Sequence, residues 1–248
     1  MHVATYGDPV GPPLLLVHGG GVAGWMWEPV RAHIDDGVRS IVPDLPGHGR
    51  STDEPYESHA VTVAALAGVL QKVGRPATVV GFSLGAQLTV QLAAEFPELV
   101  RNVIVISAQA VPMRMTRPTL ALLGATAGLA RKEWFARLQA RQLFVPDELL
   151  ADYVRTSAAI SRETLLRSVE ENLRFTPPTG WRTYTGAASI LVGAGEKSLM
   201  KRSAALLHDS LPHSTLEAVD GCGHGIPLQR AAWLARRIEA MLGAHDSP

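Results

Sequence analysis

Short, continuous apolar runs alternate with longer amphipathic stretches along most of this chain. The runs lie at residues 14–17, 41–42, 78–80, 103–106, 190–192 and 216–219. Because the apolar residues of most of these runs are contiguous rather than alternating with polar ones, the runs predict strands buried on both faces, as in a parallel sheet. Between them, Ser58 and Gly74 mark the start and end of one helical stretch, and apolar positions recur at helical spacing from Ala231 to Leu242. The alternation predicts an α/β fold with a mostly parallel, doubly wound sheet.

One long interval, residues 109–185, breaks this alternation, since it contains helical patterns and no convincing strand. An insertion between two strands of such a sheet is expected at the carboxyl ends of the strands, where open α/β sheets bind their ligands. We therefore predict a core formed by residues 1–108 and 186–248 and a helical cap, or lid, formed by residues 109–185, within one structural domain. The alternative is that these helices only enlarge the core.

Composition narrows the range of partners. The 23 lysines and arginines balance the 23 aspartates and glutamates, and this zero net charge argues against nucleic acid or an anionic membrane as the main partner. The single cysteine, Cys222, excludes an intramolecular disulfide framework. No apolar run approaches the roughly 20 residues of a membrane span, and the first residues carry no export signal. We expect a soluble, cytoplasmic protein that acts on a small molecule, in an oligomeric state that the sequence leaves open.

The most informative motif is Gly-x-Ser-x-Gly at residues 81–85, which follows an apolar run and precedes a helical pattern. A serine on such a tight strand-to-helix turn is exposed, and residues without side chains are needed on either side because the backbone is crowded there. Ser83 is therefore the candidate nucleophile. The same turn directs the N–H group of Leu84 toward the space in front of the serine hydroxyl.

A second glycine-rich turn, His18-Gly19-Gly20-Gly21, follows the first apolar run. Residues without side chains let a backbone N–H approach a substrate oxygen, so this turn and Leu84 together predict an oxyanion hole. Gly20 is the preferred donor in the turn and Gly21 the second choice. His18 is predicted to brace the loop rather than to act as a base. The competing interpretation is a plain glycine loop that ends a strand.

His224 lies between Gly223 and Gly225, just after the last apolar run. A general base must reach within about 3 Å of the serine hydroxyl, and flanking glycines permit that approach. His224 is therefore the candidate general base.

With these motifs in this order, the chain resembles the α/β-hydrolase superfamily over essentially its whole length. Residues 44–51, Asp-Leu-Pro-Gly-His-Gly-Arg-Ser, add to the resemblance, which implies structural roles for Asp44 and Arg50. Within the superfamily the chain is most similar to small bacterial esterases and cofactor-free haloperoxidase-like hydrolases with a short helical cap. No metal or other cofactor is implied, since no nucleotide-binding loop or metal-ligand spacing is present.

The third member of the triad departs from the family pattern. A serine–histidine pair normally needs a carboxylate to orient the imidazole, and the resemblance puts Ser198 where that acid is expected. Three interpretations remain open. Glu196 reaches the histidine through a differently shaped loop, or the site is a dyad helped by water or Ser198, or the acid comes from elsewhere. The end of the run at 103–106 offers Ser107 and no carboxylate.

Aromatic residues suggest where a substrate binds. Trp25, beyond the glycine turn, and Phe82, beside the nucleophile, are the candidate substrate-binding residues. Further aromatic residues lie in the predicted cap, among them Trp134, Phe135, Phe144, Tyr153 and Trp181. Some of them should line an apolar pocket, although packing roles are commoner for any single one.

The leading functional hypothesis is a serine hydrolase that cleaves an ester or thioester of a small to medium, largely apolar substrate through an acyl-enzyme. An amide, lactone or carbon–carbon bond is compatible with the same chemistry. The resemblance argues slightly against the last, because family members of the meta-cleavage type often have a second glycine after the Gly-x-Ser-x-Gly turn, where this chain has Ala86. Because Ser198 stands at the acid position, two other classes remain open. One is a non-hydrolytic tailoring enzyme for cyclisation or acyl transfer, and the other is a non-catalytic binder of small molecules.

Overall fold

A computed structural model describes residues 1–113, 116–126, 128 and 132–243. Its described residues form one sheet of seven strands in the order β1-β3-β2-β4-β5-β6-β7. The strands are β1 (Val3–Tyr6), β2 (Pro13–Val17), β3 (Arg39–Pro43), β4 (Ala77–Phe82), β5 (Val100–Ile106), β6 (Ala187–Gly193) and β7 (Thr215–Val219). Only the β1–β3 pairing is antiparallel, and all other neighbouring strands are parallel. The predicted mostly parallel sheet is confirmed.

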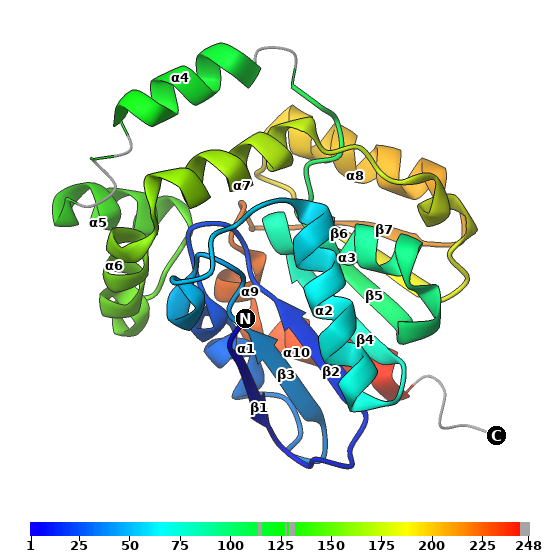
Figure 1. The fold of residues 1–248 in the computed structure, drawn as a ribbon. Coiled ribbons are helices and arrows are strands. Elements are labelled where there is room, and N and C mark those ends of the chain that lie inside the picture. Colours follow the sequence, from blue (N-terminus) through cyan, green and yellow to red (C-terminus); the bar gives the residue numbers. More distant parts are fainter. Residues whose placement is uncertain (114–115, 127, 129–131, 244–248) are drawn as a thin grey trace.

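Helices cover both faces of the sheet (Figure 1). One face carries α2 (His59–Val73), α3 (Leu84–Glu95) and α8 (Ser198–Ser210), whose apolar residues share one buried cluster. The other face carries α1 (Glu28–Arg31), α9 (Ile226–Gln229) and α10 (Ala231–Gly243). Both predicted helices are present, and α2 is capped as expected, because the Ser58 side chain accepts from the Val61 N–H and Gly74 ends the helix at φ 74°.

The apolar pattern did not predict one edge strand of the sheet and predicted the burial of the other incorrectly. The edge strand β1 was not predicted, because it is half exposed and carries no apolar run. The run at 216–219 does form β7, but the expectation that it is buried on both faces is wrong. Leu216 is 40% exposed, because β7 is the other edge of the sheet and its faces are only partly covered by helices.

Between β5 and β6 the chain forms a helical insertion, residues 109–185, that contains no strand in its described part. Its α-helices are α4 (Thr116–Thr126), α5 (Glu133–Gln142), α6 (Leu150–Ala159) and α7 (Arg162–Arg174). They lie together beyond the carboxyl ends of the parallel strands, with α7 nearest the sheet and α4 above it (Figure 1). None of the described helices is both long enough and apolar enough to cross a membrane.

A buried polar network attaches the insertion to the rest of the molecule. The side-chain amide of Gln87, on α3, donates to the carbonyls of Gln109 and Asn172, at 2.7 and 3.1 Å. Its Oε1 lies 3.0 Å from Nε2 of His59, whose other ring nitrogen contacts the Tyr56 hydroxyl at 2.9 Å. Since buried polar groups are costly unless they are paired, this network specifies how α7 sits on α3.

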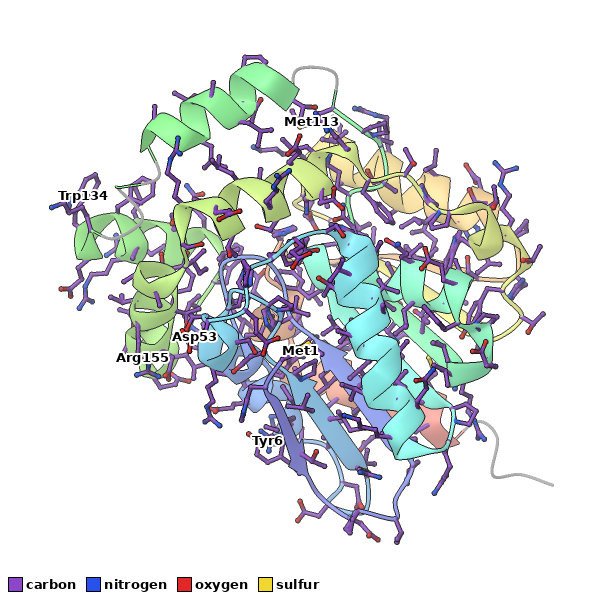
Figure 2. The ribbon with its side chains drawn as sticks, in the orientation of Figure 1. Met1, Tyr6, Asp53, Met113, Trp134 and Arg155 are labelled. Carbon is purple, nitrogen blue, oxygen red and sulfur yellow. The ribbon has the colours of Figure 1, made fainter. Side chains whose placement is uncertain are left out.

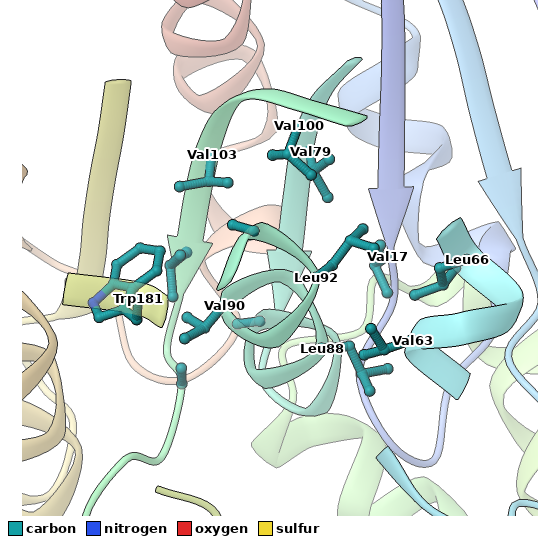
Figure 3. Packing of buried hydrophobic residues seen from close by; sticks show 14 of the residues in the cluster. Val17, Val63, Leu66, Val79, Leu88, Val90, Leu92, Val100, Val103 and Trp181 are labelled. Atoms are coloured by element: carbon teal, nitrogen blue, oxygen red, sulfur yellow. The ribbon is translucent and has the colours of Figure 1, made fainter. Parts of the chain in front are cut away.

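The α3 helix also packs deeply against the sheet. Leu88 and Leu92 of this helix are fully buried together with Val17 and Val79 (Figure 3). This packing holds the amino-terminal end of α3, where Ser83 lies, at a constant position relative to β2 and β4.

Candidate active site

Ser83 occupies a strained turn between β4 and α3. Its backbone has φ 53° and ψ −113°, and left-handed values of φ are uncommon for residues other than glycine. Its N–H donates to the Ile106 carbonyl of the neighbouring strand at 2.9 Å. The turn places the hydroxyl of Ser83 in the wall of a cavity, at the carboxyl end of the sheet.

The glycines on either side of Ser83 are required by close backbone contacts. A Cβ atom on Gly81 would lie 2.3 Å from the Gly85 carbonyl oxygen. A Cβ atom on Gly85 would lie 2.3 Å from the carbonyl oxygen of Val17 and 2.4 Å from that of His18. The Gly-x-Ser-x-Gly pattern therefore reports how closely α3 approaches the end of β2.

Gly85→Ala is expected to destabilise the protein by about 3 kcal/mol, because backbone atoms of β2 must shift to accept the new methyl group. Gly68→Ala is the matched control. Gly68 lies within α2 with no atom within 4 Å of its added Cβ, so the change should stabilise by about 0.5–1 kcal/mol. Thermal unfolding should show a Tm lowered by roughly 6–12 °C in the first variant and slightly raised in the second. Equal Tm values would contradict the close approach.

His224 joins Ser83 to a carboxylate. Its Nε2 lies 3.1 Å from the Ser83 Oγ, and its Nδ1 lies 2.9 Å from Oε2 of Glu196. A carboxylate only accepts, so Nδ1 carries the proton and Nε2 is left to accept from the serine hydroxyl. The ring also packs on Phe82, with centroids 5.1 Å apart. The structure thus brings together the three residues that the sequence proposed as catalytic.

Glu196 is held by donors from two neighbouring strands. Its side chain is only 3% exposed, and its Oε1 accepts from the Ser107 hydroxyl at 2.5 Å and from the Gly193 N–H at 3.1 Å. Burial by itself raises the pKa of Glu196, because it penalises the charged form. The hydrogen bonds that the carboxylate accepts, first of all from His224, outweigh that penalty and hold its pKa below the ordinary value.

Ser107 is a site residue that sequence reasoning did not assign. It follows β5, adjacent to the end of β6, with φ 54°, and its N–H donates to the Leu191 carbonyl at 2.8 Å. The sequence carries a signal for it, because the end of β5 is a possible source of the triad acid, but Ser107 is not a carboxylate and so does not fit that role. The structure shows that this position supplies a donor to the acid instead.

Ser198, where the family pattern expects the acid, is not a hydrogen-bond partner of the His224 ring, whose two nitrogens contact Glu196 and Ser83. It is an exposed residue at the start of α8, and its hydroxyl accepts from the Arg202 guanidinium at 3.2 Å. Of the three interpretations left open by the sequence, the geometry favours Glu196.

The predicted oxyanion donors also meet at this point. A Cβ atom on Gly20 would lie 3.6 Å from the Leu84 side chain, so the glycine turn and the start of α3 are in contact. Leu84 is the first residue of α3, and its N–H therefore has no acceptor within the helix. Gly20, Gly21 and Leu84 line the same cavity as Ser83.

His18 braces this turn, as expected. Its Nδ1 lies 2.7 Å from the Gly19 carbonyl oxygen and its Nε2 accepts from the Leu45 N–H at 2.9 Å, so both ring nitrogens are used. Burial, together with the nearby His48, lowers the pKa of His18 to about 3. Asp44 accepts from the backbone N–H groups of Gly24 and Arg50, at 2.7 and 2.9 Å, which gives it the structural role that the resemblance implied.

Because His18 stays neutral in the folded protein, acid should destabilise the fold. Below a pH of about 6.5 the unfolded chain takes up a proton that the folded chain does not, so the free energy of unfolding falls by up to about 1.4 kcal/mol per pH unit. The stability that the neutral His18 ring contributes is complete above the unfolded pKa and is lost progressively as the pH falls toward about 3. Free energies of unfolding from denaturant titrations should therefore fall less steeply between about pH 7 and 5 for His18→Gln than for the wild type. His33→Gln, at an exposed histidine, serves as the control and should keep the wild-type slope. Equal slopes for all three proteins would contradict the assignment.

The cavity in front of Ser83 measures about 640 Å³ and lies between the core, residues 1–108 and 186–248, and the helical insertion. The core contributes Gly20, Gly21, His48, Ser83 and Leu84. The insertion contributes apolar side chains, among them Phe135, Leu143, Tyr153, Leu165 and Val169. It also contributes polar ones, among them Gln139, Gln142, Arg162, Ser168 and Asn172.

Trp25 and Phe82, the candidate substrate-binding residues, are not among the residues that line this cavity. Trp25 donates through Nε1 to the Thr156 hydroxyl at 3.0 Å and packs edge-on against Tyr153, so it connects the core to α6. Phe82 is 4% exposed and packs between Gly19 and the His224 ring. Both support the walls of the site from behind.

The aromatic residues of the insertion divide between different roles. Phe135 and Tyr153 line the cavity. Trp181 is completely buried in the core, and Trp134 projects from α5 with 61% of its surface exposed (Figure 2). Phe144 packs against the glycines on both sides of His224, since a Cβ at either position would approach its ring within 2.9–3.0 Å. Among the described residues, no group of three or more His, Cys, Asp or Glu side chains is placed to hold a metal ion.

Comparison with known proteins agrees with this architecture. A model of the Alpha/beta hydrolase family matches residues 14–237. A pimeloyl-[acyl-carrier protein] methyl ester esterase of Aromatoleum aromaticum is 28% identical over 233 residues, which cover 86% of this chain and 91% of that protein.

Solved structures with the same fold include an esterase from Exiguobacterium antarcticum. It has a TM-score of 0.84 at 20% identity and covers 97% of this chain and 94% of its own. A bromoperoxidase from Bacillus anthracis also has a TM-score of 0.84, at 17% identity, over 97% of this chain and 94% of its own. These likenesses confirm the predicted fold.

Proposed function

Because this chain belongs to the alpha/beta hydrolase family, we propose that it is a serine hydrolase that cleaves an ester or thioester of a small to medium, largely apolar substrate. The observation that carries the proposal is the hydrogen-bonded series Ser83–His224–Glu196, which ends at the cavity wall. The esterase name of the relative from Aromatoleum aromaticum supports it.

In the first half of the reaction, the Ser83 Oγ attacks the carbonyl carbon of the substrate while its proton passes to the His224 Nε2. The Glu196 carboxylate stabilises the imidazolium that forms. The N–H groups of Gly20 and Leu84 donate to the oxygen that becomes negatively charged. His224 then protonates the departing alcohol or thiol, and an acyl group remains on Ser83.

In the second half, a water molecule takes the place of the leaving group. His224 removes a proton from it, and the resulting attack on the acyl carbonyl forms a second tetrahedral intermediate at the same oxyanion donors. Collapse of this intermediate returns the proton to Ser83 and releases the carboxylic acid.

The helical insertion serves in this proposal as a cap over the site. A volume of about 640 Å³ with several aliphatic and aromatic walls suits an acyl or alkoxy group of modest size. Closing such a site against bulk water strengthens the electrostatic interactions of the oxyanion donors.

A fluorophosphonate probe combined with peptide mapping tests this function. The probe should label Ser83 in the folded wild-type protein, and short-chain p-nitrophenyl esters should be hydrolysed. The absence of labelling at Ser83 in folded protein would overturn the serine-hydrolase proposal. Labelling without turnover on a broad ester panel would overturn the ester-hydrolase part and favour a tailoring or binding function.

Ser107→Ala is expected to lower kcat by about 10-fold while leaving KM nearly unchanged. The variant removes a donor to the charged carboxylate of Glu196, a loss in the range of hydrogen bonds to ions. Ser198→Ala, at the exposed serine two residues from Glu196, is the control and should retain wild-type kcat. Steady-state kinetics on one p-nitrophenyl ester gives kcat and KM for both variants and the wild type. Wild-type kcat in Ser107→Ala would show that Glu196 does not depend on this donor.

A further inference from the structure

His48 is a buried histidine in the cavity wall that takes no part in the proton transfer between Ser83 and His224. It is 1% exposed and lies in the loop after β3, with its ring centroid 5.4 Å from that of His18. The preceding Gly47 packs against Thr164 of α7, since a Cβ there would lie 2.4 Å from the threonine side chain. His48 therefore sits between the glycine turn of the oxyanion hole and the helix that covers the site.

The tautomer of His48 follows from its one hydrogen bond within the described chain. Its Nδ1 lies 2.9 Å from the carbonyl oxygen of Pro46, and a carbonyl can only accept, so Nδ1 carries the proton. Burial lowers the pKa of His48, which keeps the ring neutral. Its Nε2 is therefore a lone-pair acceptor, and no donor from the described residues reaches it.

The contrast with His18 shows why this acceptor is available. In His18 the same Nε2 atom accepts from the Leu45 backbone N–H at 2.9 Å, and its acceptor capacity is used within the protein. An acceptor in a cavity wall that no donor from the described residues uses is available to a donor from a bound molecule. In His48 this nitrogen belongs to a residue that lines the cavity together with Ser83 and Gly20.

The core contributes five described residues to the cavity wall. Gly20, Gly21 and Leu84 have no polar side chain, and Ser83 has its role in the reaction. His48 is the remaining polar side chain among them, and its Nε2 can only accept a hydrogen bond. A substrate that presents a hydrogen-bond donor near its scissile carbonyl would fit both the oxyanion donors and this acceptor.

Building on the proposed function, we propose that the Nε2 of His48 accepts a hydrogen bond from a hydroxyl or amide N–H close to the scissile carbonyl. The preferred substrates are then esters of hydroxy acids or of N-acylated amino acids rather than esters of plain alkanoic acids. A site that pairs a buried acceptor with a substrate donor discriminates strongly against the analogue that lacks it.

Matched esters and two variants test this preference. Release of acid is measured for methyl butanoate, for its 2-hydroxy and 3-hydroxy derivatives, and for the methyl ester of N-acetylglycine. The wild type should favour at least one donor-bearing ester over methyl butanoate by about 10-fold or more in kcat/KM. His48→Phe, which keeps a ring beside His18 but has no acceptor, should reduce this ratio to near one. His48→Gln, which retains an acceptor, should keep part of it, and His33→Phe, at an exposed site, should keep all of it.

Equal handling of plain and donor-bearing esters by the wild type would overturn the role of His48, and so would an unchanged preference in His48→Phe. Failure of the proposed function looks different, because no ester of the panel would then be turned over. In that event NMR titration of Ser83→Ala protein with pentan-2-one and 4-hydroxypentan-2-one measures the preference as a ratio of Kd values. Tighter binding of the hydroxyketone that is lost on adding His48→Phe would support the role, and equal Kd values would overturn it.

Discussion

Replacing Ser83 by alanine is expected to lower kcat/KM for ester hydrolysis by at least about 10⁴-fold, the largest loss we predict for any single substitution. The hydroxyl is the group that forms the acyl-enzyme, and His224 and Glu196 act only by activating it. The residual rate should be the small acceleration that oxyanion donors and binding provide on their own. Steady-state kinetics with p-nitrophenyl esters and fluorophosphonate labelling measure the effect, and both signals should disappear together.

The variant should fold, which separates a chemical effect from a structural one. Alanine accepts the left-handed backbone at this turn about as readily as serine, and the removed hydroxyl packs against no core residue. Its Tm should therefore stay within a few degrees of that of the wild type. Ser198→Ala, an exposed serine outside the site, should keep full activity. Turnover by Ser83→Ala at more than about one tenth of the wild-type rate would contradict covalent catalysis at this residue.

Glu196→Gln is expected to lower kcat by about 10³–10⁴-fold with little change in KM. Glutamine removes the negative charge that stabilises the imidazolium. Its amide end also lets the side chain donate toward His224, which favours the wrong tautomer of the ring. The loss therefore falls in kcat, because the charge is needed only as the reaction proceeds. Glu98→Gln, at an exposed glutamate, is the matched control and should behave as the wild type.

The size of this effect discriminates between the three interpretations of the triad. A serine–histidine dyad predicts a loss of less than about 10-fold in Glu196→Gln, because the carboxylate would then contribute no charge to the reaction. An acid from elsewhere predicts the same small loss. Recovery of activity in the double variant Glu196→Gln with Ser198→Asp would show that the loop can also supply a carboxylate from the position that the family pattern expects. Either small loss would contradict the role of Glu196.

Much of the fold and the site could be predicted because it depends on local constraints. A serine in a left-handed turn needs glycines at two residues on either side, since a Cβ atom on Gly81 or Gly85 would lie only 2.3 Å from a backbone oxygen. Such steric requirements appear in the sequence as a fixed spacing. The cap of α2 at Ser58 and its end at Gly74 were predictable for the same reason, because both depend on the backbone of a few consecutive residues.

The residues that line the cavity were harder to predict, because burial and side-chain direction depend on elements distant in the chain. Trp25 and Phe82 were expected to contact substrate, yet Thr156 and Tyr153 hold the indole of Trp25 and the ring of His224 covers Phe82. Edge strands were missed or misjudged for a related reason. Whether a face is covered depends on helices packed across it, and apart from Glu217 the run at 216–219 carries no sign that β7 is partly exposed.

Residues close together in the chain specify the α/β architecture, the turn that presents Ser83, the glycine loop at Gly20 and the turn that carries His224, so these features can be predicted from the sequence. Which acid faces the imidazole depends instead on contacts between distant segments. Glu196 reaches His224 because the end of β6 lies beside the end of β5, where Ser107 donates to the same carboxylate. The direction of a loop side chain follows from such contacts between distant segments, and spacing along the chain does not encode it.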